Sequence, residues 1–192
     1  MEVLGNVVRK MAGPPGRVLA KLGVSPDAIT ISGVLANIAV GVLIGMSRLS
    51  AFWTGALILA TGFIDAIDGT VARLSGKVTP FGGLLDAVVD RISEAAILLG
   101  MLVCYQRRGD GLDAIFAGAA LATFPLVSYV RGKAETLGLT VKGGIMTRTL
   151  RILALGVSFW FHVDGPTLAV LAGWSFITAI HRIVIVRQAL RR

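Results

Sequence analysis

The chain has 192 residues, of which 55% are hydrophobic and 16% charged, and its formal net charge is +8. A soluble globular domain usually carries about 25% charged residues, so this composition argues against that class. The positive charge is scattered through short segments between apolar runs, which argues against a nucleic-acid-binding protein. A single cysteine, Cys104, excludes an internal disulfide bond. We expect one helical membrane domain over residues 1–192.

Residues 2–22 place apolar residues at nearly helical spacing, with four basic residues among them and Pro14-Pro15 in the middle. This pattern is typical of an amphipathic helix at the membrane interface, and we assign residues 1–22 to such an interfacial segment. A cleaved signal peptide is the alternative. We disfavour it because basic residues interrupt any apolar core, namely Arg9, Lys10, Arg17 and Lys21.

Six apolar segments follow, each long enough to cross about 30 Å of hydrocarbon. We expect an all-α bundle over residues 27–187, with transmembrane helices at 27–46, 50–73, 82–104, 112–132, 147–163 and 166–187. Ser25-Pro26-Asp27 is expected to open the first of them, with Asp27 accepting from exposed amides, and Gly82-Gly83 to open the third. With six spans both termini share one side, which also collects most of the basic residues. The positive-inside rule then predicts cytoplasmic termini for a multi-pass protein of the cell membrane.

Four aspartates, Asp65, Asp68, Asp86 and Asp90, fall well within the expected spans, where each charged group costs at least about 2.5 kcal/mol. Asp65 and Asp68 are three residues apart near the cytoplasmic end of the second span, so they share a helix face. Asp86 and Asp90 are four apart near the cytoplasmic start of the third span. All four carboxylates can therefore meet at similar depth, where they would repel one another without cations. Such hard oxygen ligands suit Mg²⁺ or Mn²⁺, and four of them can hold two ions that bridge a diphosphate.

Two other interpretations of these aspartates stay open. They could form a structural network with Arg73 and Arg91, although acids are costly helix connectors within a membrane. They could also belong to a cation transporter, with Glu94 as the next step across the membrane. Transport favours carboxylates stepped through the depth of the bilayer, whereas these four lie together. We expect Glu94 to pair locally, with Arg91 or with a group behind the site.

The series Asp65-x-x-Asp68-Gly69-x-x-Ala72-Arg73, eight residues, Gly82-x-x-x-Asp86-x-x-x-Asp90 resembles the CDP-alcohol phosphotransferase signature at every specified position. The resemblance implies transfer of a phosphoalcohol group from a CDP-linked donor to an acceptor hydroxyl, with release of CMP. It implies two divalent cations held by the four aspartates, with Asp90 also acting as the base. It further implies contacts to the CDP moiety from Asp27, Ala28, Ile29, Thr30, Gly69, Ala72, Arg73 and Thr79. A homodimer is also implied, and Gly41-x-x-x-Gly45 has the spacing of a close helix contact, which serves packing within one chain equally well.

The second half of the chain is basic where it returns to the cytoplasmic side. Five cations could close over one anionic group with a hydroxyl donor beside them: Arg131, Lys133, Arg148, Arg151 and Arg182, with Ser128. Arginines within spans are costly unless they pair with anions, so we infer an acceptor that carries a phosphate. Anchoring by snorkelling to lipid phosphates is the alternative for any single arginine.

The stretch from Ser128 to Glu135, followed by Gly143-Gly144-Ile145 and the Arg148/Arg151 pair, resembles the phosphatidylinositol-phosphate synthase branch of that family. That branch uses inositol 1-phosphate, and the resemblance implies phosphate binding by the six residues of the basic half. Arg131 stands where a lysine is usual there, and Lys133 where an arginine is usual. The implied donor is CDP-diacylglycerol or CDP-archaeol. A phosphatidylglycerophosphate synthase using glycerol 3-phosphate is the nearest alternative, but its usual N-terminal pattern opens directly into the first span.

Overall fold

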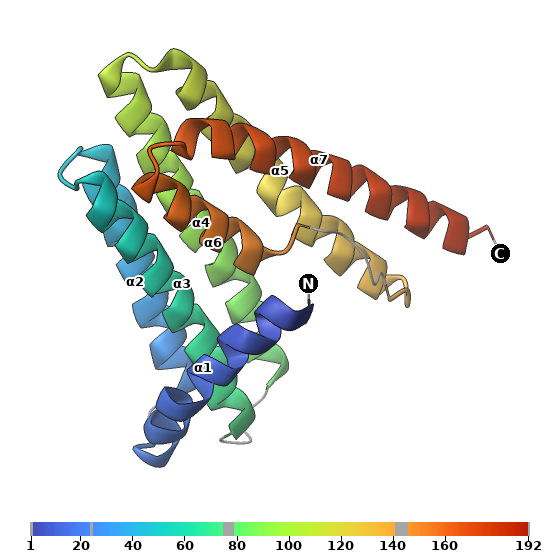
Figure 1. The fold of residues 1–192 in the computed structure, drawn as a ribbon. Coiled ribbons are helices and arrows are strands. Elements are labelled where there is room, and N and C mark those ends of the chain that lie inside the picture. Colours follow the sequence, from blue (N-terminus) through green and yellow to red (C-terminus); the bar gives the residue numbers. More distant parts are fainter. Residues whose placement is uncertain (1, 24, 75–78, 141–145, 192) are drawn as a thin grey trace.

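The computed structural model describes residues 2–23, 25–74, 79–140 and 146–191, and this part of the chain is all-helical (Figure 1). For residues 2–10, 20, 68 and 72–74 only the backbone is described. The helices are α1 (Glu2–Lys21), α2 (Pro26–Gly45), α3 (Ala51–Leu74), α4 (Pro80–Arg108), α5 (Gly111–Thr136), α6 (Arg148–Trp160) and α7 (Asp164–Ala189). The expected all-α class is confirmed, and a helix occupies each expected segment.

Three of the helices are capped at their N-terminal end by a residue with a hydroxyl side chain. Ser25, Thr79 and Thr147 have extended backbones and accept hydrogen bonds from the amides of Ala28 at 3.1 Å, Gly82 at 2.9 Å and Leu150 at 3.3 Å. Two expectations about helix starts are therefore corrected. Ser25 caps α2 in place of Asp27, which lies in the first turn, and α4 begins at Pro80, two residues before Gly82. A proline in the first turn suits both helices, because amides there lack helical partners.

The helices pack as two extensive pairs, α2 with α4 and α5 with α7, joined by contacts between α4 and α5 (Figure 1). Helix α3 packs against α2 and α6, and α1 crosses α3 on the outside. Most buried apolar side chains form one core cluster, in which Ile58, Met101 and Leu168 are almost completely enclosed. The members of this core on α4 begin at Ile97, so the N-terminal half of α4 lies outside it and is left for polar side chains.

Two glycines let α2 and α4 cross with their backbones in contact. A Cβ atom added at Gly100 would lie 2.1 Å from the carbonyl oxygen of Gly41, and one at Gly41 would lie 2.3 Å from that of Ala96. A Cβ added at Gly45 would lie 3.5 Å from the Cα of Gly100. The Gly41-x-x-x-Gly45 spacing therefore serves packing within this chain.

We expect Gly100→Leu to destabilise the protein strongly, because the new side chain must separate α2 from α4. Overpacking costs about 1–3 kcal/mol where side chains can shift, and more where backbone must move. Gly173→Leu on α7 is the matched control, since nothing lies within 4 Å of a Cβ there. Thermal unfolding in detergent measures both variants, and equal melting temperatures would contradict the crossing.

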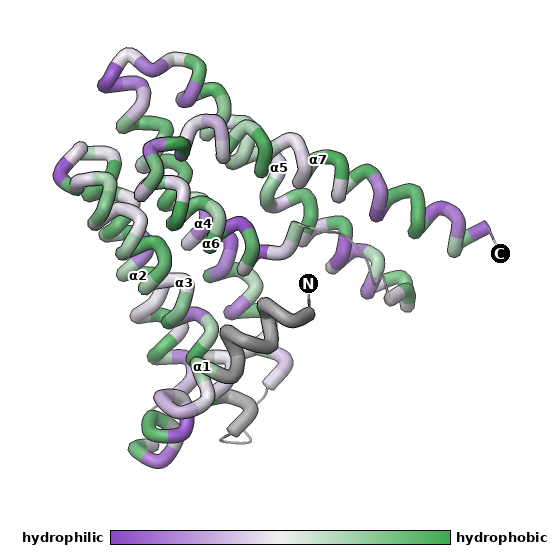
Figure 2. Tube along the Cα trace, viewed as in Figure 1, coloured by the Kyte–Doolittle hydropathy of each residue, from purple (hydrophilic) through white to green (hydrophobic). Residues whose placement is uncertain are grey.

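Four helices are long and apolar enough to cross a membrane by length and composition, namely α2, α3 over Ala51–Val71, α5 and α7. Hydrophobic residues run along most of α2 and α7, as Figure 2 shows, whereas the N-terminal end of α6 carries Arg148 and Arg151. Helix α6 has only 13 residues, and α4 carries six charged residues over its first half and last turn. Several apolar helices in one bundle make this a multi-pass membrane protein.

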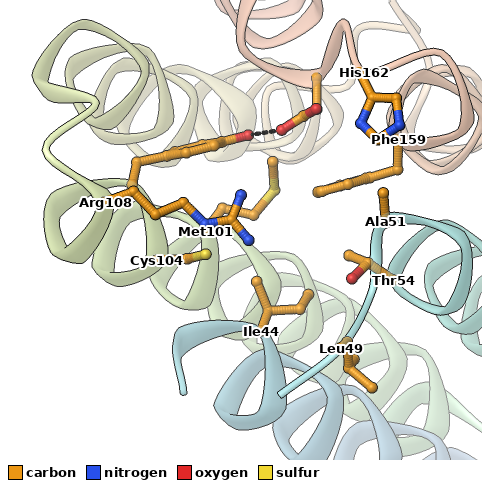
Figure 3. A pocket seen from close by; sticks show the side chains of 11 residues that line it. Ile44, Leu49, Ala51, Thr54, Met101, Cys104, Arg108, Phe159 and His162 are labelled. Atoms are coloured by element: carbon orange, nitrogen blue, oxygen red, sulfur yellow. Dashed lines mark hydrogen bonds between the residues drawn. The ribbon is translucent and has the colours of Figure 1, made fainter. Parts of the chain in front are cut away.

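A small cavity of about 50 Å³ lies between α4 and the start of α7 (Figure 3). The phenol of Tyr105 donates a hydrogen bond to the Asp164 carboxylate there. Tyr105 is 15 residues beyond Asp90, or about 22 Å along α4. The contact therefore ties α4 to the first residue of α7 at the end of the bundle opposite the expected catalytic residues.

Candidate active site

A guanidinium group connects two of the four expected metal ligands. Arg148 at the start of α6 donates from Nη2 to Oδ2 of Asp65 on α3 and from Nη1 to Oδ1 of Asp90 on α4, at 2.5 Å in each case. These residues are separated in sequence, so the packing of α3, α4 and α6 brings them together. A cation thus lies between two carboxylates that would otherwise repel each other.

Gly33 on α2 makes room for one of these carboxylates. A Cβ added at Gly33 would lie 3.1 Å from Oδ1 of Asp65 and 3.6 Å from the side chain of Ile64. The Asp65 carboxylate therefore rests against the backbone of α2 while its other oxygen faces Arg148. The sequence offers a signal for this glycine, because a glycine inside an apolar helix often marks a close approach.

The other two expected metal ligands are Asp86 and Asp68. Asp86 is exposed near the start of α4 and lines the same cavity as Asp90. The side chains of Asp68, Ala72 and Arg73 lie outside the described part of the structure, although the α3 backbone passes through all three. Among the side chains that are described, no group of three or more carboxylates, histidines or cysteines could hold a metal ion.

Two cavities meet at Asp90 and Arg148, which line both of them. The first cavity, of about 410 Å³, is mostly apolar and lies among α1, α3 and α6. Its lining includes Met11, Leu59, Phe63 and Ile152, together with Asp65. We call it the apolar groove. Its walls suit hydrocarbon chains, and its polar end is formed by the two bridged carboxylates.

The second cavity, of about 440 Å³, lies among α4, α5, α6 and α7 and is strongly charged. We call it the basic cavity. Five of the six expected phosphate-binding residues line it: Ser128, Arg131, Arg148, Arg151 and Arg182. Lys133, the sixth, is exposed and does not belong to its described lining. Gly143-Gly144-Ile145 lies outside the described residues. Helix packing therefore gathers most of the predicted basic set around one space.

Glu94 holds one of these arginines from behind. Arg151 donates from Nε and Nη2 to Oε1 of Glu94, at 3.1 and 2.7 Å, and from Nη2 to Oε2 at 3.0 Å. Its guanidinium carbon also lies 4.6 Å from the centroid of the Phe124 ring, and Arg151 is 2% exposed. Glu94 thus pairs with Arg151 in place of Arg91, which donates to the carbonyl of Ala87. The sequence did not predict this partner, because Glu94 and Arg151 are 57 positions apart and lie on different helices.

Two further arginines of the basic cavity, Arg182 and Arg131, are held by α5. Arg182 on α7 is 8% exposed and donates from Nη1 to the carbonyl oxygen of Val127 at 2.6 Å. Arg131 pairs with Glu135 one turn later at 3.0 Å, and both side chains are exposed. The cavity therefore combines two buried, fixed guanidinium groups with a more accessible one at its mouth.

Residues expected to contact a nucleotide gather at the starts of α2 and α4. Asp27 and Ala28 are exposed, whereas Ile29 and Thr30 are buried. A Cβ at Gly82 would lie 3.1 Å from Oγ1 of Thr79 and 3.9 Å from Oδ1 of Asp27, so the two helix starts are neighbours. Gly69 lies on α3, the helix that carries Asp65. Helix N-terminal ends attract anions, which suits phosphate groups beside them.

Partly buried carboxylates and arginines around two joined cavities, within a bundle of apolar helices, define a membrane enzyme that acts on a charged substrate. A family model described as CDP-alcohol phosphatidyltransferase matches residues 23–186, and the chain belongs to this family of enzymes. The archaetidylinositol phosphate synthase of Methanothermobacter thermautotrophicus is 33% identical over 96% of this chain and 93% of its own length. The phosphatidylinositol phosphate synthase of Mycobacterium marinum is 33% identical over 86% of this chain and 72% of its own length.

Solved structures of a relative have a fold similar to that of this chain. The crystal structure of Mycobacterium tuberculosis phosphatidylinositol phosphate synthase with CDP-DAG bound is similar with a TM-score of 0.79 and 31% identity, covering 92% of this chain and 94% of that one. The same enzyme in complex with manganese and citrate gives a TM-score of 0.79 and 32% identity, covering 91% and 88%. At this identity the likeness extends beyond the fold to the family of transferases.

The residues of this site fit a hard divalent cation. Arg148 shows that one cation can touch oxygens of Asp65 and Asp90 together. The atoms that meet at this point are carboxylate oxygens, which are the ligands that Mg²⁺ and Mn²⁺ prefer. The family and the manganese complex of a relative also indicate divalent cations.

Proposed function

We propose that this protein transfers the phosphatidyl or archaetidyl group of a CDP-linked lipid to inositol 1-phosphate and releases CMP. The observation that carries the proposal is the junction of the apolar groove and the basic cavity at Asp90 and Arg148. A lipid donor and a phosphorylated, water-soluble acceptor would then meet at one carboxylate. The names of the two relatives support inositol phosphate as the acceptor.

The reaction needs a base beside the acceptor hydroxyl. Asp90 takes the hydroxyl proton, and the hydroxyl oxygen forms a bond to the lipid-bearing phosphorus as the bond from that phosphorus to CMP breaks. Asp65, Asp68, Asp86 and Asp90 would hold two divalent cations, which would neutralise charge on the diphosphate and on the leaving CMP.

The donor is CDP-diacylglycerol or CDP-archaeol. Its hydrocarbon chains occupy the apolar groove, and its diphosphate lies at the carboxylates near the starts of α2 and α4. The CDP moiety is contacted by the set Asp27, Ala28, Ile29, Thr30, Gly69, Ala72, Arg73 and Thr79. A relative crystallised with CDP-DAG supports this class of donor.

The acceptor phosphate binds in the basic cavity. Arg148, Arg151 and Arg182 supply fixed guanidinium donors, which match phosphate oxygens in geometry. Ser128 and Arg131 approach from α5, and Lys133 is placed in the set by its position in the motif. The phosphate thereby holds the inositol hydroxyl against Asp90.

The placement in the membrane is part of the proposal. All six helices from α2 to α7 belong to one membrane domain, residues 1–192, and α1 lies along the cytoplasmic interface. The termini and the active site face the cytoplasm, where the basic residues are concentrated. The family resemblance also supports a homodimer.

The test is CMP release by the purified protein with CDP-diacylglycerol and Mg²⁺, compared among inositol 1-phosphate, glycerol 3-phosphate, free inositol and serine. We expect inositol 1-phosphate to give the fastest release and chelation of Mg²⁺ to abolish it. Faster release with glycerol 3-phosphate would keep the chemistry and refute the acceptor. Absence of CMP with every acceptor, also with CDP-archaeol, would refute the transferase and favour a carboxylate-lined transporter.

A further inference from the structure

Arg148 belongs to two sites at once. Its two terminal nitrogens hold Asp65 and Asp90, the expected metal ligands, and its side chain also lines the basic cavity. The guanidinium therefore occupies a cation position between carboxylates and borders the space proposed for the acceptor phosphate. The two terminal nitrogens that donate to the carboxylates cannot donate fully to a phosphate at the same time.

The bridge also leaves Arg148 incompletely bonded. Its Nε is buried, and no acceptor for it is found among the described residues. A buried donor without an acceptor costs about 1–3 kcal/mol. A phosphate oxygen in the basic cavity would satisfy such a donor. The observed arrangement thus serves the carboxylates and leaves hydrogen-bonding capacity unused.

Two other arginines of the basic cavity donate to groups outside the set of expected metal ligands. Arg151 is held by Glu94, which is outside the set of expected metal ligands, and Arg182 donates to a backbone carbonyl. A cation that approached Asp65 and Asp90 would compete directly with Arg148 and would leave these two contacts in place. The geometry singles out one arginine on which metal and phosphate both act.

We propose that Arg148 couples the two ligands: it occupies the cation position between Asp65 and Asp90 until a divalent metal displaces it toward the acceptor phosphate. This rests on the proposed function, in which those aspartates bind metal and the basic cavity binds phosphate. Two consequences follow by linkage. Removal of Arg148 strengthens metal binding, and metal binding strengthens phosphate binding only while Arg148 is present.

The first experiment measures Mn²⁺ binding to the full-length protein in detergent, without donor or acceptor, from the electron paramagnetic resonance signal of free Mn²⁺. We expect Arg148→Gln to bind Mn²⁺ about tenfold more tightly than the wild type. Arg148→Lys keeps the positive charge, but lysine has one nitrogen, whereas Arg148 reaches the two carboxylates with two. This variant should therefore also bind Mn²⁺ more tightly than the wild type. Arg131→Gln removes a charge from the same cavity without touching either aspartate and should leave Mn²⁺ affinity unchanged.

The second experiment measures binding of inorganic phosphate by calorimetry with and without Mg²⁺. We expect Mg²⁺ to tighten phosphate binding about tenfold in the wild type and to have no such effect in Arg148→Gln. Weaker Mn²⁺ binding by both Arg148 variants would show that the arginine supports the metal ligands and would overturn the coupling. A wild type that binds no Mn²⁺ would overturn the metal-dependent function as well, whereas tight but Arg148-independent binding overturns the coupling alone.

Discussion

Asp90→Asn should lower CMP release at least about 10³-fold while donor binding stays within a few-fold of the wild type. A positioned base contributes about 10²–10⁴-fold to the rate, and the amide of asparagine cannot take the proton. Asn has nearly the same shape as Asp, so packing of α4 should be unaffected. Asp90 lines both cavities, which is why its loss should affect the chemical step more than either binding step.

The measurement separates CMP release from equilibrium binding of CDP-diacylglycerol. Asp110→Asn is the matched control, because Asp110 is exposed and precedes α5 at the opposite end of the bundle. It should release CMP at the wild-type rate. Turnover retained by Asp90→Asn would remove Asp90 from the role of base.

Arg151→Ala should weaken acceptor binding and also destabilise the protein by about 3–5 kcal/mol, because it leaves a charged partner without its pair. The structure explains this second effect. Arg151 is 2% exposed and makes three hydrogen bonds with Glu94. Acceptor KM and the melting temperature should therefore change together in this variant, and CMP binding should stay close to that of the wild type.

A double variant separates the two effects. Arg151→Met with Glu94→Leu replaces the ion pair by apolar side chains of similar size, an exchange that is often neutral or stabilising. It should recover most of the lost melting temperature and keep the high acceptor KM. Arg131→Ala is the control for stability, since an exposed pair such as Arg131–Glu135 contributes about 0.2–1 kcal/mol. Recovery of acceptor binding in the double variant would refute a direct role for Arg151.

Helix positions could be predicted because long apolar runs and hydroxyl or proline residues mark their ends. The segment at 147–163 corresponds to α6, which ends at Trp160. His162, with a positive φ of 54°, makes the turn into α7, and a single sequence gives little warning of such a turn. Ser25-Pro26-Asp27 predicts the start of α2, but Ser25 and Asp27 are both residue types that cap helices. In the structure the hydroxyl of Ser25 is the group that accepts the capping hydrogen bond, from the amide of Ala28.

The site was predictable where its residues share a helix. Asp86 and Asp90 belong together by spacing on α4, and Arg148 and Arg151 by spacing on α6. The pairs Arg148–Asp65 and Arg151–Glu94 join residues 83 and 57 positions apart, so only the packing of α3, α4 and α6 specifies them. Gly33 was missed for the same reason, since its role is to admit a carboxylate from another helix.

The shortness of α6 bears on the depth at which the chemistry takes place. Its 13 residues extend about 20 Å, whereas the hydrocarbon core is about 30 Å thick. Trp160, at the end of α6, donates to the carbonyl of Phe52, and tryptophans of this kind favour the interface. Arg148 would then lie about 10 Å beneath the opposite interface. A phosphorylated acceptor must lose bulk water to reach that depth. The guanidinium groups of the basic cavity offset the free-energy cost of this dehydration.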